Sequence, residues 1–94
     1  MFKELDPLLH SQLRLAVISI LISVEFAEFT FLKEKTNSSA GNLSVQLEKL
    51  SAAGYIEITK SFKGKRPLTT CKITKNGIKA FEVYVNSLKQ YINK

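Results

Sequence analysis

The chain has little of the material from which catalytic and metal sites are built. Its 94 residues include one cysteine, Cys71, one histidine, His10, and no tryptophan. A lone cysteine excludes a disulfide within the chain, and the two residues lie too far apart to match a metal-cluster motif. There is also no plausible Ser-His-acid or Cys-His set and no phosphate-binding loop. We therefore expect that the protein is not an enzyme and uses no cofactor or metal.

Long apolar runs and targeting signals are also scarce. The apolar stretch 15–24 covers ten residues, well short of the ~20 that a membrane span needs. The first residues carry acids and a proline where a signal peptide has a basic patch and an apolar run. We therefore predict a cytoplasmic protein of the reducing compartment, with no membrane partner.

Length and composition indicate a single globular domain over residues 1–94. Hydrophobic residues make up 45% of the chain and charged residues 23%, which is too apolar for intrinsic disorder. A chain of this length forms one core and buries only roughly 60–65% of the surface of its unfolded state. Association of subunits would therefore add stability, and a dimer is plausible.

The positive charge is concentrated in the second half of the chain. Of the net charge of +6, residues 1–54 contribute five Lys or Arg against six Asp or Glu, whereas residues 55–94 contribute nine against two. A basic segment of this kind suits a polyanion that is held through its phosphates, and nucleic acid is the first candidate. Composition alone leaves open a solvated basic face that only aids solubility.

Apolar periodicity and capping signals predict helices in the first half. A first helix is expected to begin at Asp6 and Pro7 and to run to about residue 22. A minimal strand at 24–26 and a second helix at about 27–35 follow. The polar cluster 36–39 predicts a turn that also caps the next helix.

A third helix is expected over about 39–53, with Leu43, Leu47 and Leu50 in one narrow apolar stripe and Gly54 just after its end. The β-branched runs 56–62 and 68–73 predict a hairpin with a cationic tip. Thr74 is expected to cap a last helix to about Ile92, and Cys71 to fill the core.

This order of elements is that of a winged helix-turn-helix, an α+β fold with a three-helix core, a two-stranded β-hairpin wing and a C-terminal dimerisation helix. Six stretches in the same order resemble the winged-helix transcriptional regulators related to the MarR and ArsR groups. They are residues 5–10, 14–16, 41–44, 53–56, 62–70 and 73–77.

The resemblance implies a homodimer joined through its first and last helices, which binds a pseudo-palindromic operator in double-stranded DNA. Metal sensors of the ArsR type use groups of Cys and His, which this sequence lacks, and we expect no metal sensing. Related regulators often bind small-molecule effectors. The sequence shows no candidate pocket, so an effector stays unknown.

The face of the third helix opposite its leucines carries short hydrogen-bonding side chains, and we expect it to enter the major groove. Asn42 and Gln46 can each pair with an adenine edge, whereas a lysine is suited to phosphate. The wing, residues 62–68, is expected on the minor groove or backbone. The predicted DNA-binding residues are Ser38, Ser39, Asn42, Ser44, Gln46, Lys49, Lys63, Lys65 and Arg66.

Each of these assignments has a plain alternative. The helix face could be an ordinary exposed surface, and lysines at a hairpin tip also guard against edge aggregation. The whole domain could serve as a winged-helix module for protein or RNA interaction. For the dimer, the apolar excess of the terminal helices suggests contacts through Leu9, Leu13, Phe81, Tyr84, Val85, Leu88 and Tyr91.

Overall fold

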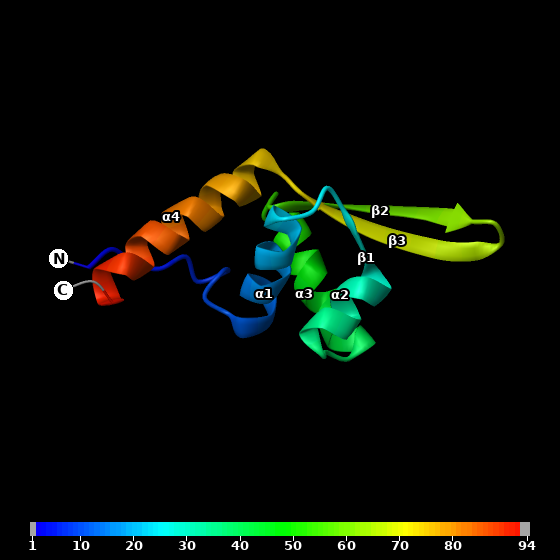
Figure 1. Cartoon of the computed structure of the whole chain (residues 1–94), viewed down its shortest axis with the longest axis horizontal. Coiled ribbons are helices and arrows are strands. Elements are labelled where there is room, and N and C mark those ends of the chain that lie inside the picture. The colour runs from blue at the N-terminus through cyan, green and yellow to red at the C-terminus, as the bar shows by residue number, and fades with distance from the viewer. Residues whose placement is uncertain (1, 93–94) are drawn as a thin grey trace.

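Three helices and a three-stranded antiparallel sheet form the body of the structure, and a fourth helix extends from it (Figure 1). This is a computed structural model, and it describes residues 2–92. The elements in chain order are α1 (Gln12–Ile22), β1 (Ala27–Glu28), α2 (Phe29–Thr36), α3 (Ala40–Ala52), β2 (Ile56–Lys63), β3 (Arg66–Ile73) and α4 (Lys75–Ile92). The predicted winged helix-turn-helix order is confirmed.

The first helix begins later than predicted. The backbone carbonyl of Asp6 accepts the N–H groups of Leu9 and His10, and its Oδ1 accepts the N–H of Leu8 at 2.9 Å. Asp6 therefore caps a turn, as its chemistry predicts, but this turn is separate from α1. The backbone is extended at Ser11, with φ of −147°, and α1 begins only at Gln12.

This turn serves the tertiary structure. It places Leu9 in the core, where the side chain is fully buried. Asp6 Oδ2 accepts a hydrogen bond from the hydroxyl of Tyr55 at 2.6 Å. That bond, with burial and the negative charge of Asp6, raises the pKa of Tyr55 from 10.0 to about 12.

The short strand also differs from the prediction. It consists of Ala27 and Glu28, which pair with Cys71 and Thr70 of β3, and the apolar residues at 24–26 are exposed. Hydrophobicity alone favoured 24–26. The structure instead pairs Ala27 with Cys71, and Ala27 is buried beside β3.

Strands β2 and β3 form a hairpin that is longer than predicted. Its register runs from Ile56 opposite Ile73 to Lys63 opposite Arg66. The turn therefore consists of Gly64 and Lys65 alone. Gly64 has φ of 66°, a left-handed conformation that glycine adopts without steric cost.

The core lies between α1, α2 and α3 and is closed on one side by the sheet. The predicted leucine stripe of α3 is confirmed, since Leu43, Leu47 and Leu50 are all buried. Cys71 is buried, as predicted for a core residue, and burial raises the pKa of its thiol to about 11. The other buried apolar side chains are those of Leu9, Val17, Ile18, Leu21, Ala27, Leu32, Ile56 and Tyr84.

The beginning of α4 is packed tightly against the rest of the fold. Thr74 caps it as predicted, because its hydroxyl oxygen accepts the N–H of Gly77 at 3.0 Å while its hydroxyl donates to the Gly54 carbonyl at 2.6 Å. Gly77 leaves no room for a side chain: an added Cβ would lie 2.2 Å from the carbonyl oxygen of Tyr55.

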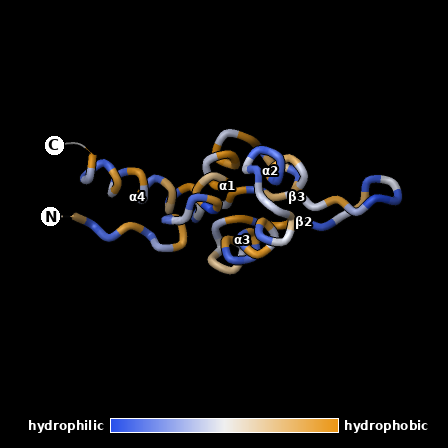
Figure 2. Tube along the Cα trace, turned by 90° about the horizontal axis from the view of Figure 1, so that it is seen from below, coloured by the Kyte–Doolittle hydropathy of each residue, from blue (hydrophilic) through white to orange (hydrophobic). Residues whose placement is uncertain are grey.

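The molecule is elongated, with extents of 54, 25 and 21 Å. Its radius of gyration is 14.2 Å, against about 12 Å for a compact domain of this length. Figures 1 and 2 show why: the hairpin extends from the body in one direction, with a hydrophilic tip, and α4 extends in the other. Within residues 2–92, no helix is long and apolar enough to cross a membrane.

Candidate nucleic-acid interface

The turn before α3 is held by its own side chains. Asn37 ends α2 in the left-handed conformation with φ of 53°, and Ser39 caps α3 by accepting the N–H of Asn42 at 3.1 Å. The predicted N-cap is therefore confirmed as Ser39, which is exposed at the helix N-terminus.

Ser38 differs from its neighbour. The hydroxyl of Thr36 donates to the Leu32 carbonyl at 2.7 Å, so the Ser38 hydroxyl must donate to Thr36 across their 2.9 Å contact. The backbone N–H of Ser38 donates to Lys33. Both donors of Ser38 are thus used within the chain, and its predicted contact with DNA stays a prediction.

The outward face of α3 is open where the sequence predicts it. Asn42, Ser44 and Lys49 are exposed, opposite the buried leucines. Gln46 is different, because its side chain is only half-exposed and makes two hydrogen bonds. Its Oε1 accepts from Nη1 of Arg14, and its Nε2 donates to Asn42 Oδ1 at 3.0 Å.

These bonds change the role expected for the two amides. Asn42 and Gln46 are bonded to each other, so the orientation of one amide constrains the other, and their contacts with adenine stay a prediction. Arg14, on α1, is a residue of this face that the sequence analysis did not identify. It lies 32 positions before Gln46, and no pattern in the sequence joins the two.

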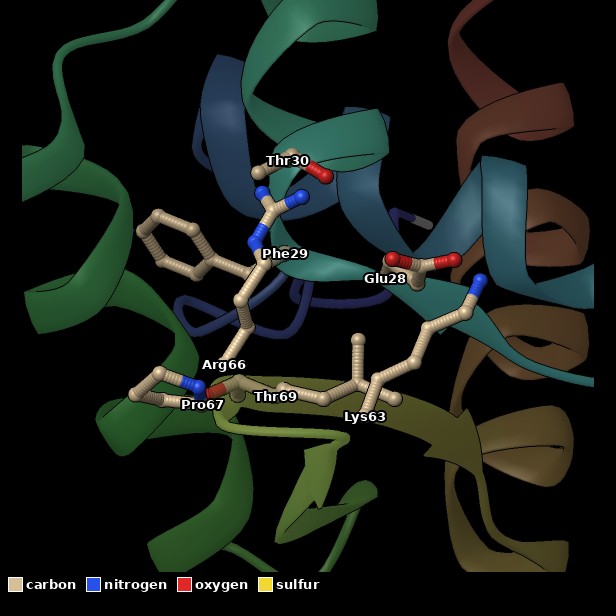
Figure 3. A pocket seen from close by; sticks show the side chains of 8 residues that line it. Glu28, Phe29, Thr30, Lys63, Arg66, Pro67 and Thr69 are labelled. Atoms are coloured by element: carbon tan, nitrogen blue, oxygen red, sulfur yellow. The ribbon is translucent and has the colours of Figure 1, made fainter.

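The wing carries its basic residues at the tip. Lys63, Lys65 and Arg66 are exposed, and Lys63 and Arg66 are direct cross-strand partners. In Figure 3 the guanidinium of Arg66 points toward Thr30 at the start of α2, and the ammonium group of Lys63 points toward Glu28.

A groove of about 460 Å³ separates this end of α2 from the wing. Sequence reasoning did not identify its α2 residues, because a wing and a helix start meet only through the fold. The groove is lined by Glu28, Phe29, Thr30, Lys63, Arg66, Pro67, Leu68 and Thr69.

A second hollow, of about 240 Å³, joins α3 to the same surface. Ser44 and Glu48 of α3 line it together with Phe29 and with Lys60 and Thr69 of the hairpin. The edge of α3 at Ser44 and Glu48, the start of α2 and the hairpin therefore border one continuous surface.

Comparison with known proteins agrees with this geometry. The family model of the winged helix DNA-binding domain matches residues 13–92. The chain belongs to the winged-helix DNA-binding family. An uncharacterized protein of Methanocaldococcus jannaschii is 38% identical over 81 residues, which cover 86% of this chain and 88% of the relative.

Solved structures of transcriptional regulators, including MarR-family members, share the fold of this winged-helix protein. A transcriptional regulator homologue from Pyrococcus horikoshii OT3 has a TM-score of 0.84 at 26% identity, over 92% of this chain and 85% of that one. A MarR-family transcriptional regulator from Silicibacter pomeroyi shares the fold, with a TM-score of 0.67 at 17% identity, over 92% of this chain and 60% of that one. The predicted MarR resemblance is confirmed, and the ArsR relation stays a prediction.

These relatives are transcriptional regulators and not enzymes, in agreement with the sequence analysis. Among residues 2–92 of the winged-helix protein, no group of three or more His, Cys, Asp or Glu side chains is arranged as metal ligands would be.

Two of the predicted dimer contacts are core residues instead. Leu9 is fully buried and Tyr84 is 4% exposed in the single chain. The hydroxyl of Tyr84 lies 3.0 Å from Nδ1 of His10. The expectation that Leu9 and Tyr84 face a partner is wrong, because the turn before α1 and the first half of α4 pack on the same core.

The other predicted contacts keep accessible surface. Leu13, Phe81, Val85 and Leu88 are half-buried, and Tyr91 is exposed. Tyr91 stacks on Phe2 with ring centroids 4.7 Å apart and donates to the Lys3 carbonyl at 3.1 Å. The N-terminal segment therefore lies along the end of α4.

Proposed function

We propose that this winged-helix protein is a homodimeric transcriptional regulator that binds double-stranded DNA in a sequence-specific manner. Helix α3 enters the major groove, and the wing contacts the minor groove or the backbone. The observation that carries this proposal is the single surface on which Ser44 of α3 and Lys60 of the hairpin line one hollow.

The proposed contacts follow from exposure and charge. Asn42 and Ser44 reach base edges, while Lys49 and the N-terminus of α3 at Ser39 meet phosphates. Lys63, Lys65 and Arg66 hold the backbone beside the wing, since arginine and lysine neutralise phosphates and release counterions.

The proposed dimer is supported by apolar side chains of α4 that the single chain does not cover. Val83 is 53% exposed and Ile92 is 69% exposed, although α4 is an 18-residue helix whose first half packs on the core. Pairing of α1 and α4 would set two copies of α3 roughly 34–36 Å apart, so that the half-sites of a pseudo-palindromic operator would be centred about ten base pairs apart.

Sedimentation of variants tests the dimer. We expect wild type to sediment as a dimer at micromolar concentration and Val83→Glu to sediment as a monomer, because a charge would be buried at the interface. Val45→Glu is the matched control, since Val45 is 52% exposed on α3, outside the two helices proposed to pair, and its replacement should leave the dimer intact. If wild type sediments as a monomer, the proposal that two copies of α3 bind one operator is refuted.

Fluorescence anisotropy tests DNA binding. Selected genomic duplexes and a scrambled control are titrated with the protein at several salt concentrations. We expect an inverted repeat to be bound at least ~10³ times more tightly than the control, with a steep salt dependence. Equal weak binding to both would refute sequence-specific binding and favour a module for protein or RNA interaction.

The proposed cellular location follows from this role. We propose the cytoplasm as the place of action, where a regulator meets its DNA. No effector is proposed.

A further inference from the structure

A chain of hydrogen bonds runs from the N-terminal turn to the exposed face of α3. The backbone carbonyl of Leu8 accepts from Nε of Arg14 at 2.6 Å, and Nη1 of Arg14 donates to Gln46 Oε1. Gln46 Nε2 then donates to Asn42 Oδ1 at 3.0 Å. Leu8 itself is held by the carboxylate of Asp6. The bonds thus connect three separate segments and end on the surface proposed to read DNA.

The donor-to-acceptor direction of these hydrogen bonds is set by the chemistry of arginine. A guanidinium only donates hydrogen bonds, so the Gln46 amide must turn its oxygen toward Arg14. Its NH₂ group then faces Asn42 and requires an acceptor there. Asn42 therefore accepts this hydrogen bond through Oδ1, and its own NH₂ group is left free.

The result is a surface that offers donors. Asn42 is exposed, and within residues 2–92 its Nδ2 makes no hydrogen bond. Oδ1 of Asn42 gives one of its two lone pairs to Gln46, one turn further along α3, and this bond fixes the plane of the amide, whereas Nδ2 keeps both of its N–H donors. A bidentate contact with adenine needs Oδ1 and Nδ2 together at one base edge, because adenine presents a donor at N6 and an acceptor at N7. Guanine presents two acceptors, O6 and N7, and needs donors only.

We propose that Arg14 sets the hydrogen-bonding polarity of the α3 surface, so that Asn42 reads guanine in preference to adenine. The proposal rests on the proposed function of DNA binding. Arg14 is a positioning residue, because it acts through Gln46 and Asn42 and needs no contact with the base. It also replaces the expectation, drawn from residue types alone, that the two amides read adenine.

The experiment measures base preference at the operator position that Asn42 reads. Asn42→Ala identifies that position as the one whose preference disappears. Duplexes with guanine, inosine, 7-deazaguanine or adenine there are then titrated with wild type. Inosine keeps O6 and N7 and should bind like guanine, 7-deazaguanine lacks N7 and should bind more weakly, and adenine should bind about tenfold more weakly.

Variants of Arg14 and Gln46 test its positioning role. Arg14→Met removes the donors at similar length, so the Gln46 amide can reverse, and the preference for guanine should fall below about threefold. Arg14→Lys keeps a side chain that only donates and should retain the preference. In Gln46→Glu the carboxylate accepts from Arg14 but cannot donate to Asn42, so Asn42 should reverse, expose Oδ1 and favour adenine or cytosine, whose edges carry donors.

The outcomes separate this proposal from the proposed function. A wild type without selective duplex binding would refute the function itself. Selective binding with adenine preferred at the Asn42 position, or a guanine preference unchanged in Arg14→Met, would overturn the polarity proposal alone. Loss of the preference in both Arg14 variants would also overturn it, since arginine would then act only as a structural support. Gln46→Glu keeps Arg14 in place, so it tests polarity even if Arg14→Met fails to fold.

Discussion

Replacing Gly77 with alanine should destabilise the protein, because the structure has no room for a methyl group there. The added Cβ would lie 2.2 Å from the carbonyl oxygen of Tyr55 and 2.9 Å from Cγ1 of Ile73. Cβ atoms in real structures essentially never lie closer than 3.0 Å to such an atom. To restore that distance between the new Cβ and the Tyr55 oxygen, the start of α4 must move by about 0.8 Å relative to Tyr55. That carbonyl cannot simply withdraw, since it accepts the N–H of Thr74 at 3.0 Å.

The expected cost combines two effects. Overpacking in a tight site costs typically 1–3 kcal/mol, and the higher helix propensity of alanine offsets roughly 0.5–1 kcal/mol of it. The difference spans roughly 0–2.5 kcal/mol, and because the clash is with backbone we expect its upper part, a loss of about 1–2.5 kcal/mol in the free energy of unfolding, which lowers Tm by roughly 4–20 °C.

Gly41→Ala is the matched control. Gly41 also lies in a helix, α3, but a Cβ there would meet nothing within 4 Å. This variant should be more stable than wild type by roughly 0.5–1 kcal/mol. Both are measured by urea unfolding at one fixed protein concentration, because a dimer's stability depends on concentration. A Gly77→Ala protein as stable as wild type would refute the close approach of α4 to Tyr55.

Three further predictions concern the wing, a tyrosine and the cysteine. Arg66→Ala should weaken binding to all duplexes and reduce the slope of log K against log salt concentration by about 0.9. Lys89→Ala, at the far end of α4, should change neither. An unchanged slope for Arg66→Ala would show that Arg66 makes no phosphate contact. Tyr55 has a pKa of about 12 when folded and 10.0 as its ordinary value, so the stabilisation by its bond to Asp6 is complete below pH 10 and is lost as pH rises toward 12. Urea unfolding from pH 8 to 12 should therefore show wild type losing its advantage over Tyr55→Phe, and a constant difference would contradict the bond. The Cys71 thiol is buried, and its pKa is raised to about 11. At pH 8 it should therefore react with a thiol reagent at least ~10² times more slowly in the native protein than in denaturant. Equal rates would show that the thiol is not buried.

Sequence patterns predicted the structure correctly where that structure depends only on residues close together in the chain. The spacing of Leu43, Leu47 and Leu50 places them on one face of a helix, and that face is buried. Gly54 and Thr74 mark the end of one helix and the start of another, because a left-handed conformation and an N-cap are properties of a few adjacent residues.

The predictions failed where the structure depends on contacts between segments that are distant in the sequence. The strand was expected at 24–26, yet pairing with Cys71 selected Ala27. Leu9 was expected to face a partner, yet a separate turn carries it into the core. In both cases the apolar character was recognised, and only the packing determined which apolar residue is covered.

The sequence by itself therefore determined the winged-helix fold, the helix with the buried leucine stripe and the basic wing, since periodicity, caps and charge act over short stretches of chain. The tertiary structure alone decided how the outward side chains of α3 are held. Arg14 meets Gln46 across 32 positions, and this contact sets the direction of the Gln46 amide and, through it, that of Asn42. The physical reason is that a side-chain amide can face either way in isolation, and its direction is set only by the partner that the fold brings to it.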